Sequence, residues 1–310
     1  MGDVPCVSRI TGPDELRRLF GHLGLTGRHI IVKPNWFSLY PGNYTDAEIL
    51  DLVLTSLGGP ATVVESYTGM RHDGSRRITP RNACSHWEWL REQDKWFLET
   101  TGIGAVLQRH GATYINVTEE VWSERVAPYH EVASRVESRY GAVDQPELYS
   151  YVPFRLFELA GSPLLSLARF KGGWSLSLKN LFGLIPDPLR VRWHGPGDRD
   201  LARSIVNINL VYHALFRVVG LVETFAPFSL YRQGGAHHTP WGAYDLMPAA
   251  GVAFAGTNLP AVDAAVARAA GAKPGELKYL QLAEARGLGA WAEGLQVEVP
   301  ADLASALAGR

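Results

Sequence analysis

The chain has 310 residues, which suffices for one large domain or two modest ones, and 46% of them are hydrophobic, enough for a substantial buried core. The 30 basic and 31 acidic residues leave a formal net charge of −1, which excludes the overall charge excess that attracts a polyanion. We therefore expect a globular protein that binds no nucleic acid and no membrane.

The cysteine content limits redox and metal chemistry. Cys6 and Cys84 are the two cysteines of the chain and no CxxC motif occurs, so we expect no iron–sulfur cluster and no cysteine zinc site. The N-terminal segment lacks the basic and apolar pattern of a secretion signal, and no run of about 18 apolar residues occurs. We expect a cytoplasmic location with both thiols reduced.

The N-terminal part of the chain has a strand, helix, strand order. An amphipathic pattern predicts a helix over residues 14–23, and the run HIIVKPNW predicts a buried strand that ends near Lys33. Thr45 and Glu48 form a capping box before a helix, and ATVVESY predicts the next buried strand. This order predicts a parallel sheet, in which ligands gather at the carboxyl ends of the strands.

The middle of the chain is less regular. Residues 85–109 are predicted to form one helix rich in aromatic side chains, and residues 112–117 a third strand. Residues 119–155 are polar, tyrosine-rich and poorly periodic, so we expect an insertion or a lid there. The chain then forms either one body or two lobes, about 1–118 and 160–310, with a cleft between them.

The second half again alternates strands and helices. We predict strands over 162–168, 218–224 and 295–300, helices over 200–216, 260–270 and 275–287, and a loop rich in glycine and histidine over 233–241. The complete pattern predicts an α/β fold with a mainly parallel sheet flanked by helices.

Polar side chains interrupt the otherwise apolar segment 168–195. Lys171, Lys179 and Asn180 lie here among apolar residues and glycines. An unpaired buried ammonium is unfavourable or loses its proton, so such groups pair with each other or bind a ligand. We expect Lys179 to be catalytic and Lys171 and Asn180 to bind substrate. The alternative is that Asn180 satisfies backbone groups in a turn while Lys179 extends to solvent.

A charged cluster follows Pro186. Asp187 and His194 are candidates for catalytic proton transfer, because imidazole titrates near neutral pH and a carboxylate orients it. Arg190 and Arg192 are candidates for binding an anionic substrate. The alternative is a surface loop with scattered ion pairs.

Polar residues also end the first two predicted strands. Lys33 and Asn35 flank Pro34 and suit the carboxylate or phosphate of a ligand. Glu65, at the end of the next strand, is either a catalytic base or the ion-pair partner of Lys33.

Two further groups of residues have a candidate role. The adjacent His237 and His238, together with Asp263, suit a divalent metal, although neighbours in an extended segment point opposite ways and Asp263 also suits the start of a helix. The region from Trp87 to Trp96, with Trp122, Tyr129 and Tyr140, provides either core packing or an aromatic wall for an apolar substrate.

Three blocks of sequence point to a known family. LKNLFGLIPDPLR followed by WHG, IVKPNW near the N-terminus, and TNLPAVDAAVARAAGAKP followed by ARGLG together resemble the domain-of-unknown-function family 362 (DUF362). The resemblance implies an α/β fold with a site between the blocks, and it implies no single reaction. Many relatives carry cysteine-rich ferredoxin-type segments, which this chain does not have.

Three functions remain open, because the chain contains none of the motifs GxGxxG, GxxxxGK[ST], GxSxG and HExxH. The first is a non-redox enzyme of the lyase, isomerase or cyclase type, which performs acid/base chemistry on an anionic small molecule in specialised metabolism. The second is a non-catalytic protein that binds a metal or a cofactor. The third is an oxidoreductase whose cofactor site has no recognisable motif. The tendency of soluble proteins to form symmetric oligomers would allow a homodimer.

Overall fold

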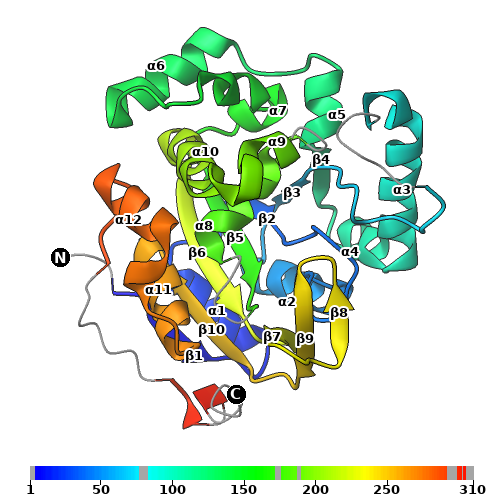
Figure 1. Ribbon diagram of the computed structural model, residues 1–310, viewed down its shortest axis with the longest axis vertical. Helices are drawn as coiled ribbons and strands as arrows, with labels where there is room; N and C mark the ends of the chain where they lie inside the picture. The colour runs from blue at the N-terminus through cyan, green and yellow to red at the C-terminus, as the bar shows by residue number, and fades with distance from the viewer. Residues whose placement is uncertain are drawn as a thin grey trace.

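Seven strands form the central sheet of the protein. The computed structural model describes residues 4–76, 83–171, 176–186, 190–291, 299–301 and 303–304. In order across the sheet (Figure 1), the strands are β1 (Cys6–Arg9), β10 (Val252–Gly256), β6 (Arg217–Glu223), β5 (Pro163–Arg169), β2 (Ile30–Lys33), β3 (Ala61–Glu65) and β4 (Thr113–Asn116). The four pairings among β2 to β6 are parallel, and β10 runs antiparallel to β1 and β6. The predicted α/β fold with a mainly parallel sheet is confirmed.

The chain changes direction across the sheet between β2 and β5. β3 and β4 follow on one side of β2, and the chain then returns to place β5 on the other side. In the register of these two strands, Lys33 of β2 lies opposite Ser166 of β5. Such a switch point leaves a crevice outside the carboxyl ends of the two strands. The candidate site described below lies at these strand ends.

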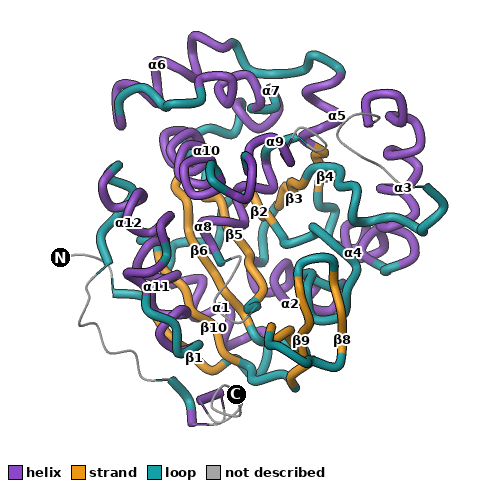
Figure 2. Tube along the Cα trace, in the orientation of Figure 1, coloured by secondary structure: helices purple, strands orange, loops and turns teal. Residues whose placement is uncertain are grey.

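Helices cover both faces of the sheet (Figure 2). Alternate residues of β2 point to opposite faces, so that Ile31 belongs to one hydrophobic core and Val32 to the other. The core around Val32 is covered by α1 (Pro13–His22), α2 (Ala47–Leu57) and α4 (Ile103–Arg109). On the opposite face lie α8 (Ser177–Leu181), α10 (Leu201–Leu215) and α11 (Leu259–Ala269), with α6 (Tyr129–Tyr140) and α12 (Lys278–Ala285) packed against α10.

The start of α2 differs from the predicted capping box. Asp46 is the N-cap, and its carboxylate accepts a hydrogen bond from the backbone N–H of Ile49 at 3.0 Å. The hydroxyl of Thr45 instead accepts a hydrogen bond from the backbone N–H of Asn35 at 2.9 Å. Thr45 therefore holds the loop that follows β2, which contains one of the predicted site residues.

Two elements of the structure depart from the prediction. Residues 85–109 do not form one helix, because Gly102 has a φ of +75° and separates α3 (Trp87–Thr100), which follows the short helix η1 (Ala83–His86), from α4. The predicted loop over 233–241 contains a strand. It belongs to a small antiparallel sheet of β7 (Phe228–Tyr231), β9 (Gly242–Met247) and β8 (His237–Thr239).

Residues 119–155 connect β4 to β5 and are mostly helical. They contain most of α5 (Val117–Trp122), all of α6, the short helix η2 (Pro146–Tyr151) and the start of α7 (Phe154–Phe157). Strands from before residue 118 and after residue 160 share one sheet, and two lobes are not confirmed. The short helix η5 (Pro274–Glu276) and α12 replace the helix predicted over 275–287, and most of the strand predicted over 295–300 lies outside the described residues. No helix in the described ranges is long and apolar enough to span a bilayer.

Candidate functional site

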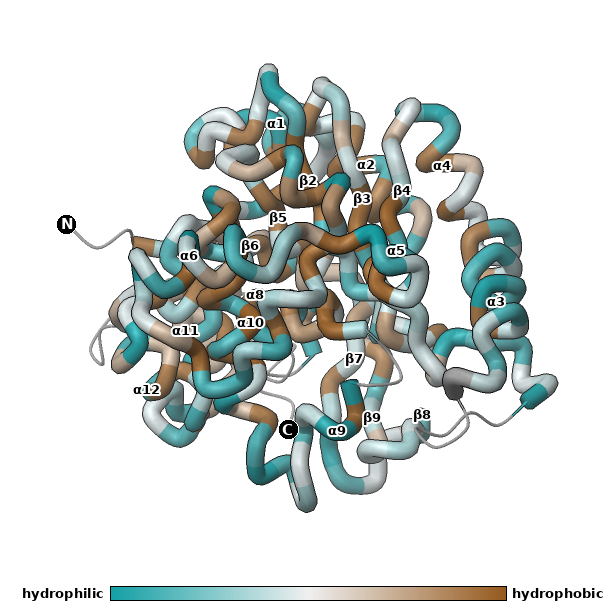
Figure 3. The backbone as a smooth tube through the Cα atoms, turned by 90° about the horizontal axis from the view of Figure 1, so that it is seen from above, coloured by the Kyte–Doolittle hydropathy of each residue, from teal (hydrophilic) through white to brown (hydrophobic). Residues whose placement is uncertain are grey.

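A cavity of about 590 Å³ lies at the carboxyl ends of β2, β3 and β5. Seen from above, α9 (Arg190–His194) and the small sheet lie on the same side of the molecule, opposite α1 (Figure 3). The cavity contains eight of the predicted site residues: Lys33, Asn35, Glu65, Lys171, Lys179, Asn180, Arg190 and His194. Five stretches of the sequence, at strand ends and in short helices, thus contribute to one space.

Lys33 and Glu65 form a buried ion pair at the base of this cavity. The Nζ of Lys33 lies 2.8 Å from Oε2 of Glu65 and also donates a hydrogen bond to the carbonyl oxygen of Pro34 at 2.7 Å. Glu65 further accepts hydrogen bonds from the backbone N–H groups of Trp36 and Ser66. Burial lowers the pKa of Lys33, and the charge of Glu65 opposes that shift. Of the two roles predicted for Glu65, the geometry shows the ion pair with Lys33.

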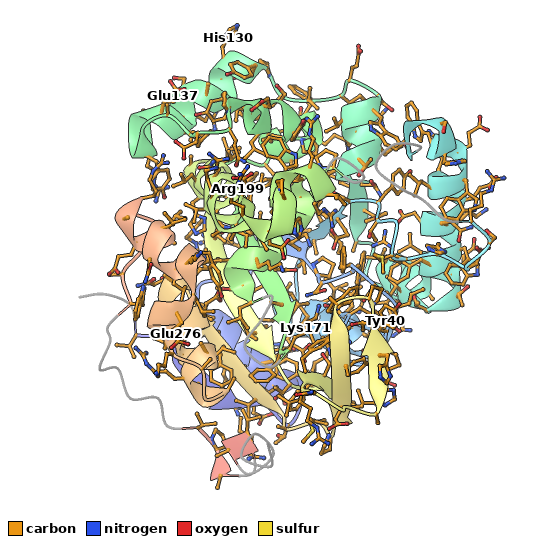
Figure 4. The ribbon with its side chains drawn as sticks, viewed as in Figure 1. Tyr40, His130, Glu137, Lys171, Arg199 and Glu276 are labelled. Atoms are coloured by element: carbon orange, nitrogen blue, oxygen red, sulfur yellow. The ribbon has the colours of Figure 1, made fainter. Side chains whose placement is uncertain are left out.

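Lys171 follows the last residues of β5 and has no charged partner among the described residues. Its Nζ donates a hydrogen bond to Oδ1 of Asn35 at 3.1 Å, and its side chain is buried. Burial lowers the pKa of Lys171 to about 7, and the charges of Lys179, Arg169 and Lys33 act in the same direction. Its amine is therefore a group that gains and loses a proton near neutral pH. Figure 4 marks Lys171 where the ends of the central strands approach the small sheet.

Asn180 joins the two strands at the switch point. Its Nδ2 donates hydrogen bonds to the carbonyl oxygen of Lys33 at 2.9 Å and to Oγ of Ser166 at 3.1 Å. The alternative interpretation of Asn180, that it satisfies backbone groups, therefore matches the observed contacts. Asn180 also lines the cavity. Because its amide is hydrogen-bonded to the backbone of Lys33, it fixes the position of that residue at the cavity.

Asp263 positions the short helix α8. It is fully buried in α11 and accepts hydrogen bonds from the backbone N–H groups of Ser177 and Leu178 and from the hydroxyl of Ser177. Burial raises the pKa of Asp263 to about 7. These contacts hold the first turn of the helix that carries Lys179 and Asn180 into the cavity.

The three residues predicted as metal ligands do not form a cluster within the described ranges. The carboxylate of Asp263 is hydrogen-bonded to the start of α8, whereas His237 and His238 lie exposed on β8. Nowhere in the described residues do three or more His, Cys, Asp or Glu side chains come together in a way that could hold a metal ion. The sequence does not show that α11 faces α8, so the contacts of Asp263 could not be predicted from it.

Two further cations line the cavity in different ways. Lys179 is partly exposed, has no hydrogen-bond or ion-pair partner among the described residues, and has its pKa lowered by burial. The guanidinium of Arg190 is buried and donates hydrogen bonds to the carbonyl oxygens of Ile185 and Gly183 at 3.1 Å and of Tyr67 at 3.4 Å. Arg190 therefore carries a positive charge into the cavity with no carboxylate bound to it in the described part of the chain.

His194 and Asp198 form a pair at the more exposed side of the cavity. Nδ1 of His194 lies 2.7 Å from Oδ1 of Asp198, and the two side chains are 32% and 68% exposed. The imidazole ring also meets the ring of Phe182 edge to face, with 5.2 Å between ring centroids. This is the geometry of an imidazole oriented by a carboxylate, with its second nitrogen left for a ligand.

Two predicted residues are not seen in the cavity. Arg192 is exposed, and its guanidinium donates a hydrogen bond to the hydroxyl of Tyr151 and lies over the ring of Trp193. The prediction that Arg192 lines the site with Arg190 is therefore wrong, because these residues, two apart on α9, point in different directions. Asp187 lies outside the described residues.

An aromatic group forms the rim of the cavity. Phe37 and Trp241 lie with their ring centroids 5.5 Å apart and are 38% and 45% exposed. The indole N–H of Trp241 donates a hydrogen bond to the hydroxyl of Tyr231, which in turn donates one to Oδ1 of Asn43. Tyr40, marked in Figure 4 beside the small sheet, packs edge to face on Trp241. The small sheet thus places apolar rings opposite the cations.

The aromatic wall predicted from the middle of the chain lies elsewhere. Trp87 and Trp122 pack edge to face, and Tyr67 and Trp87 both donate hydrogen bonds to Glu119. None of these four side chains lines the cavity. Their use is core packing, which was the alternative interpretation of this region.

Several cavity residues were not predicted from the sequence: Trp36, Phe37, Asn43, Phe182, Gly183, Tyr231 and Trp241. The strongest signal available was the position of Trp36 and Phe37 directly after Lys33 and Asn35. The small sheet had no comparable signal, since its strands are short and its outer strand reads as a polar loop.

The fold and the cavity together define an α/β protein with a cation-lined pocket at the switch point of its sheet. Residues 164–268 match the family model described as Domain of unknown function (DUF362), which confirms the resemblance over the stretch from β5 to α11. The IVKPNW block and the ARGLG block lie outside the matched residues. The chain matches no curated protein and no solved structure.

Proposed function

We propose that the protein is a non-redox enzyme of the lyase, isomerase or cyclase type, which performs acid/base chemistry on an anionic small molecule held in this cavity. The observation that carries the proposal is the charge of the lining: Lys33, Lys171, Lys179 and Arg190 are cationic groups, against the carboxylates of Glu65 and Asp198. The cationic groups outnumber the carboxylates in this lining, and a bound anion would balance the excess positive charge.

The lining residues suit different tasks in such a reaction. Lys179 and Arg190 have no carboxylate partner among the described residues and hold the anionic group of the substrate. The pair of Lys33 and Glu65 keeps the cavity base rigid through three hydrogen bonds to Glu65. Lys171 and His194 transfer protons, since the first titrates near neutral pH and the second is oriented by Asp198.

The rim gives a further property of the substrate. Phe37, Tyr231 and Trp241 present ring faces and edges at the outer part of a cavity whose inner part is cationic. A volume of about 590 Å³ is in the range of small-molecule sites. The substrate is therefore an anion with an apolar body, which suits a cytoplasmic enzyme of specialised metabolism.

Anion binding at Lys179 provides the test. We expect the Lys179→Met variant to bind a co-purified anion, or a carboxylate or phosphate found by thermal-shift screening, about tenfold more weakly because one charge-assisted contact is lost. Native mass spectrometry identifies the co-purified ligand, and isothermal titration calorimetry measures the affinity. Lys95→Met, which removes an exposed lysine on α3, is the matched control.

Two results would contradict the proposal. One is an equal affinity of the wild type, Lys179→Met and Lys95→Met for every anion tested. The other is a visible chromophore or a stoichiometric transition metal in the purified protein, detected by absorption spectroscopy or elemental analysis, because redox or metal chemistry would then explain the site.

A further inference from the structure

The four cations of the cavity differ in what surrounds them. Lys33 has Glu65 at 2.8 Å, and Arg190 is held by three carbonyl oxygens. Lys179 is partly exposed, and the charge of Asp198 favours its protonated form. Lys171 is the buried lysine among them that has no carboxylate partner in the described part of the chain, and its amine donates to the side-chain amide oxygen of Asn35.

The surroundings of Lys171 disfavour its ammonium form from several directions. Arg169, two residues earlier, is itself buried and paired with Glu223 and Asp46. Lys33 and Lys179 share the cavity with Lys171. Burial and these positive charges lower the pKa of Lys171 to about 7 against the opposing charge of Glu65, so the neutral amine is accessible near neutral pH. A neutral amine is a nucleophile, whereas an ammonium ion is not.

We propose that Lys171 acts as a covalent nucleophile, which forms an imine with the carbonyl group of an anionic aldehyde or ketone bound in the cavity. This inference rests on the proposed function, because the anion must first be held by the neighbouring cations. It assigns to Lys171 a bond-forming task in place of simple substrate binding, and it narrows the substrate to an oxo acid or a related anionic carbonyl compound.

The reaction balances without an oxidant, a reductant or a metal. The nitrogen lone pair of Lys171 adds to the carbonyl carbon, the carbonyl π electrons move to oxygen, and proton transfer gives a neutral carbinolamine. His194, in the same cavity, donates a proton to the hydroxyl, which leaves as water and generates the iminium ion. The iminium then accepts the electrons of an adjacent C–H bond, and the proton passes to His194, which leaves an enamine. Reprotonation of the enamine and hydrolysis by water release the product and return the free amine.

Reductive trapping tests this proposal with glyoxylate as the probe and sodium cyanoborohydride as the reductant. Reduction of the imine leaves an adduct with the mass of the probe less one oxygen, which intact-mass spectrometry detects and peptide mapping locates. We expect Lys171 to be labelled at pH 7 at least about tenfold faster than an exposed lysine such as Lys95, whose side chain lies in solvent beside Glu99. Labelling of Lys171 should also fall about tenfold between pH 8 and pH 6, as a group with pKa near 7 requires.

The controls separate this inference from the proposed function. Lys171→Met should lose the adduct, and Lys95→Met should keep it. If Lys171→Met does not fold, as judged by circular dichroism, the pH profile of wild-type labelling decides instead. Glycolate has the carboxylate of glyoxylate but a hydroxyl group in place of the aldehyde, so it can bind as an anion and cannot form an imine. Its binding is measured by slower labelling of the wild type or by a higher melting temperature.

Each outcome has a defined meaning. Selective, pH-dependent labelling of Lys171 that glycolate slows supports both proposals. Glycolate binding without an adduct on Lys171 overturns the imine and leaves the anion site intact. No glycolate binding, together with an adduct spread evenly over exposed lysines, overturns both.

Discussion

Gly183 shows how closely the protein packs around the ion pair at the base of the cavity. A Cβ added at this glycine would lie 2.8 Å from Nζ of Lys33 and 3.0 Å from Oε1 of Glu65. Carbon atoms do not approach polar atoms so closely, so one of the two charged groups would have to move. The residue is a glycine because the chain passes directly over the pair.

Replacing this glycine should therefore weaken both stability and binding. We expect Gly183→Ala to lower the free energy of unfolding by about 1–3 kcal/mol, because overpacking displaces a buried ion pair. Urea denaturation followed by circular dichroism measures the change. Gly161→Ala gives a comparison at a position where an added Cβ meets no atom within 4 Å, although its positive φ of 88° adds backbone strain there. A Gly183→Ala variant that equals the wild type would show that the pair can move freely.

At the scale of elements, the contact between α11 and α8 positions two of the residues that line the cavity, Lys179 and Asn180. α8 has five residues, too few for an isolated helix to be stable in water. Asp263 holds its first two residues, Ser177 and Leu178, and the next two are Lys179 and Asn180. Substitution of Asp263 therefore tests how the site is supported without removing any residue that lines it.

The pH dependence of stability gives that test. Burial raises the pKa of Asp263 in the folded protein to about 7, above the ordinary value of 3.8, so the folded state holds this proton more tightly than the unfolded state. The contribution of this bound proton to the free energy of unfolding is fully present below pH 4 and is lost as the pH rises through 7. Between pH 4 and pH 8 the free energy of unfolding of the wild type should therefore fall. That of Asp263→Asn, which has no such proton, should fall by about 1–4 kcal/mol less over the same range. Urea denaturation at both pH values measures this, and parallel changes would contradict it.

The elements that the sequence predicted well are those with one dominant signal. The runs around Ile31, Val64, Leu165 and Val219 are apolar and β-branched or leucine-rich, and all four lie in buried strands of the parallel sheet. The antiparallel strands β7, β8 and β9 were missed. They are short, and their hydrogen bonds join residues that no local periodicity connects, such as His237 and Tyr244.

At the scale of the whole molecule, a cation-lined cavity reduces the stability of the protein that carries it. In the folded state the pKa of Lys171 lies at about 7, below the ordinary value of 10.5. The folded state therefore disfavours the charged amine. This penalty is complete below pH 7 and fades as the pH rises from 7 to 10.5.

Removal of that amine should stabilise the fold. We expect Lys171→Met to raise the free energy of unfolding by about 1–3 kcal/mol at pH 6, because methionine fills a similar volume without a charge. The gain should shrink as the pH approaches 10. Urea denaturation at pH 6 and pH 9.5 measures the difference, and a variant less stable than the wild type at both pH values would show that the amine supports the fold.

The arrangement of the candidate site was predicted in part. The sequence placed Lys33, Glu65 and Lys171 at strand ends, and the parallel order of the strands brings those ends together. It did not reveal which side chains pair, since the partner of Asp263 lies 86 residues away at Ser177. It also left open whether Trp87 and Trp122 pack in the core or form an aromatic wall, because composition alone does not show which rings face the solvent and which face the core.

The register between β2 and β5 has a consequence for how this protein tolerates change in its length. Sliding β5 by two residues along β2 would keep every side chain on its present face and so preserve the hydrophobic layers. It would also move Lys171 about 7 Å relative to Asn35 and Lys33. A two-residue insertion or deletion inside β5 should therefore leave a folded molecule in which Lys171 no longer reaches Asn35.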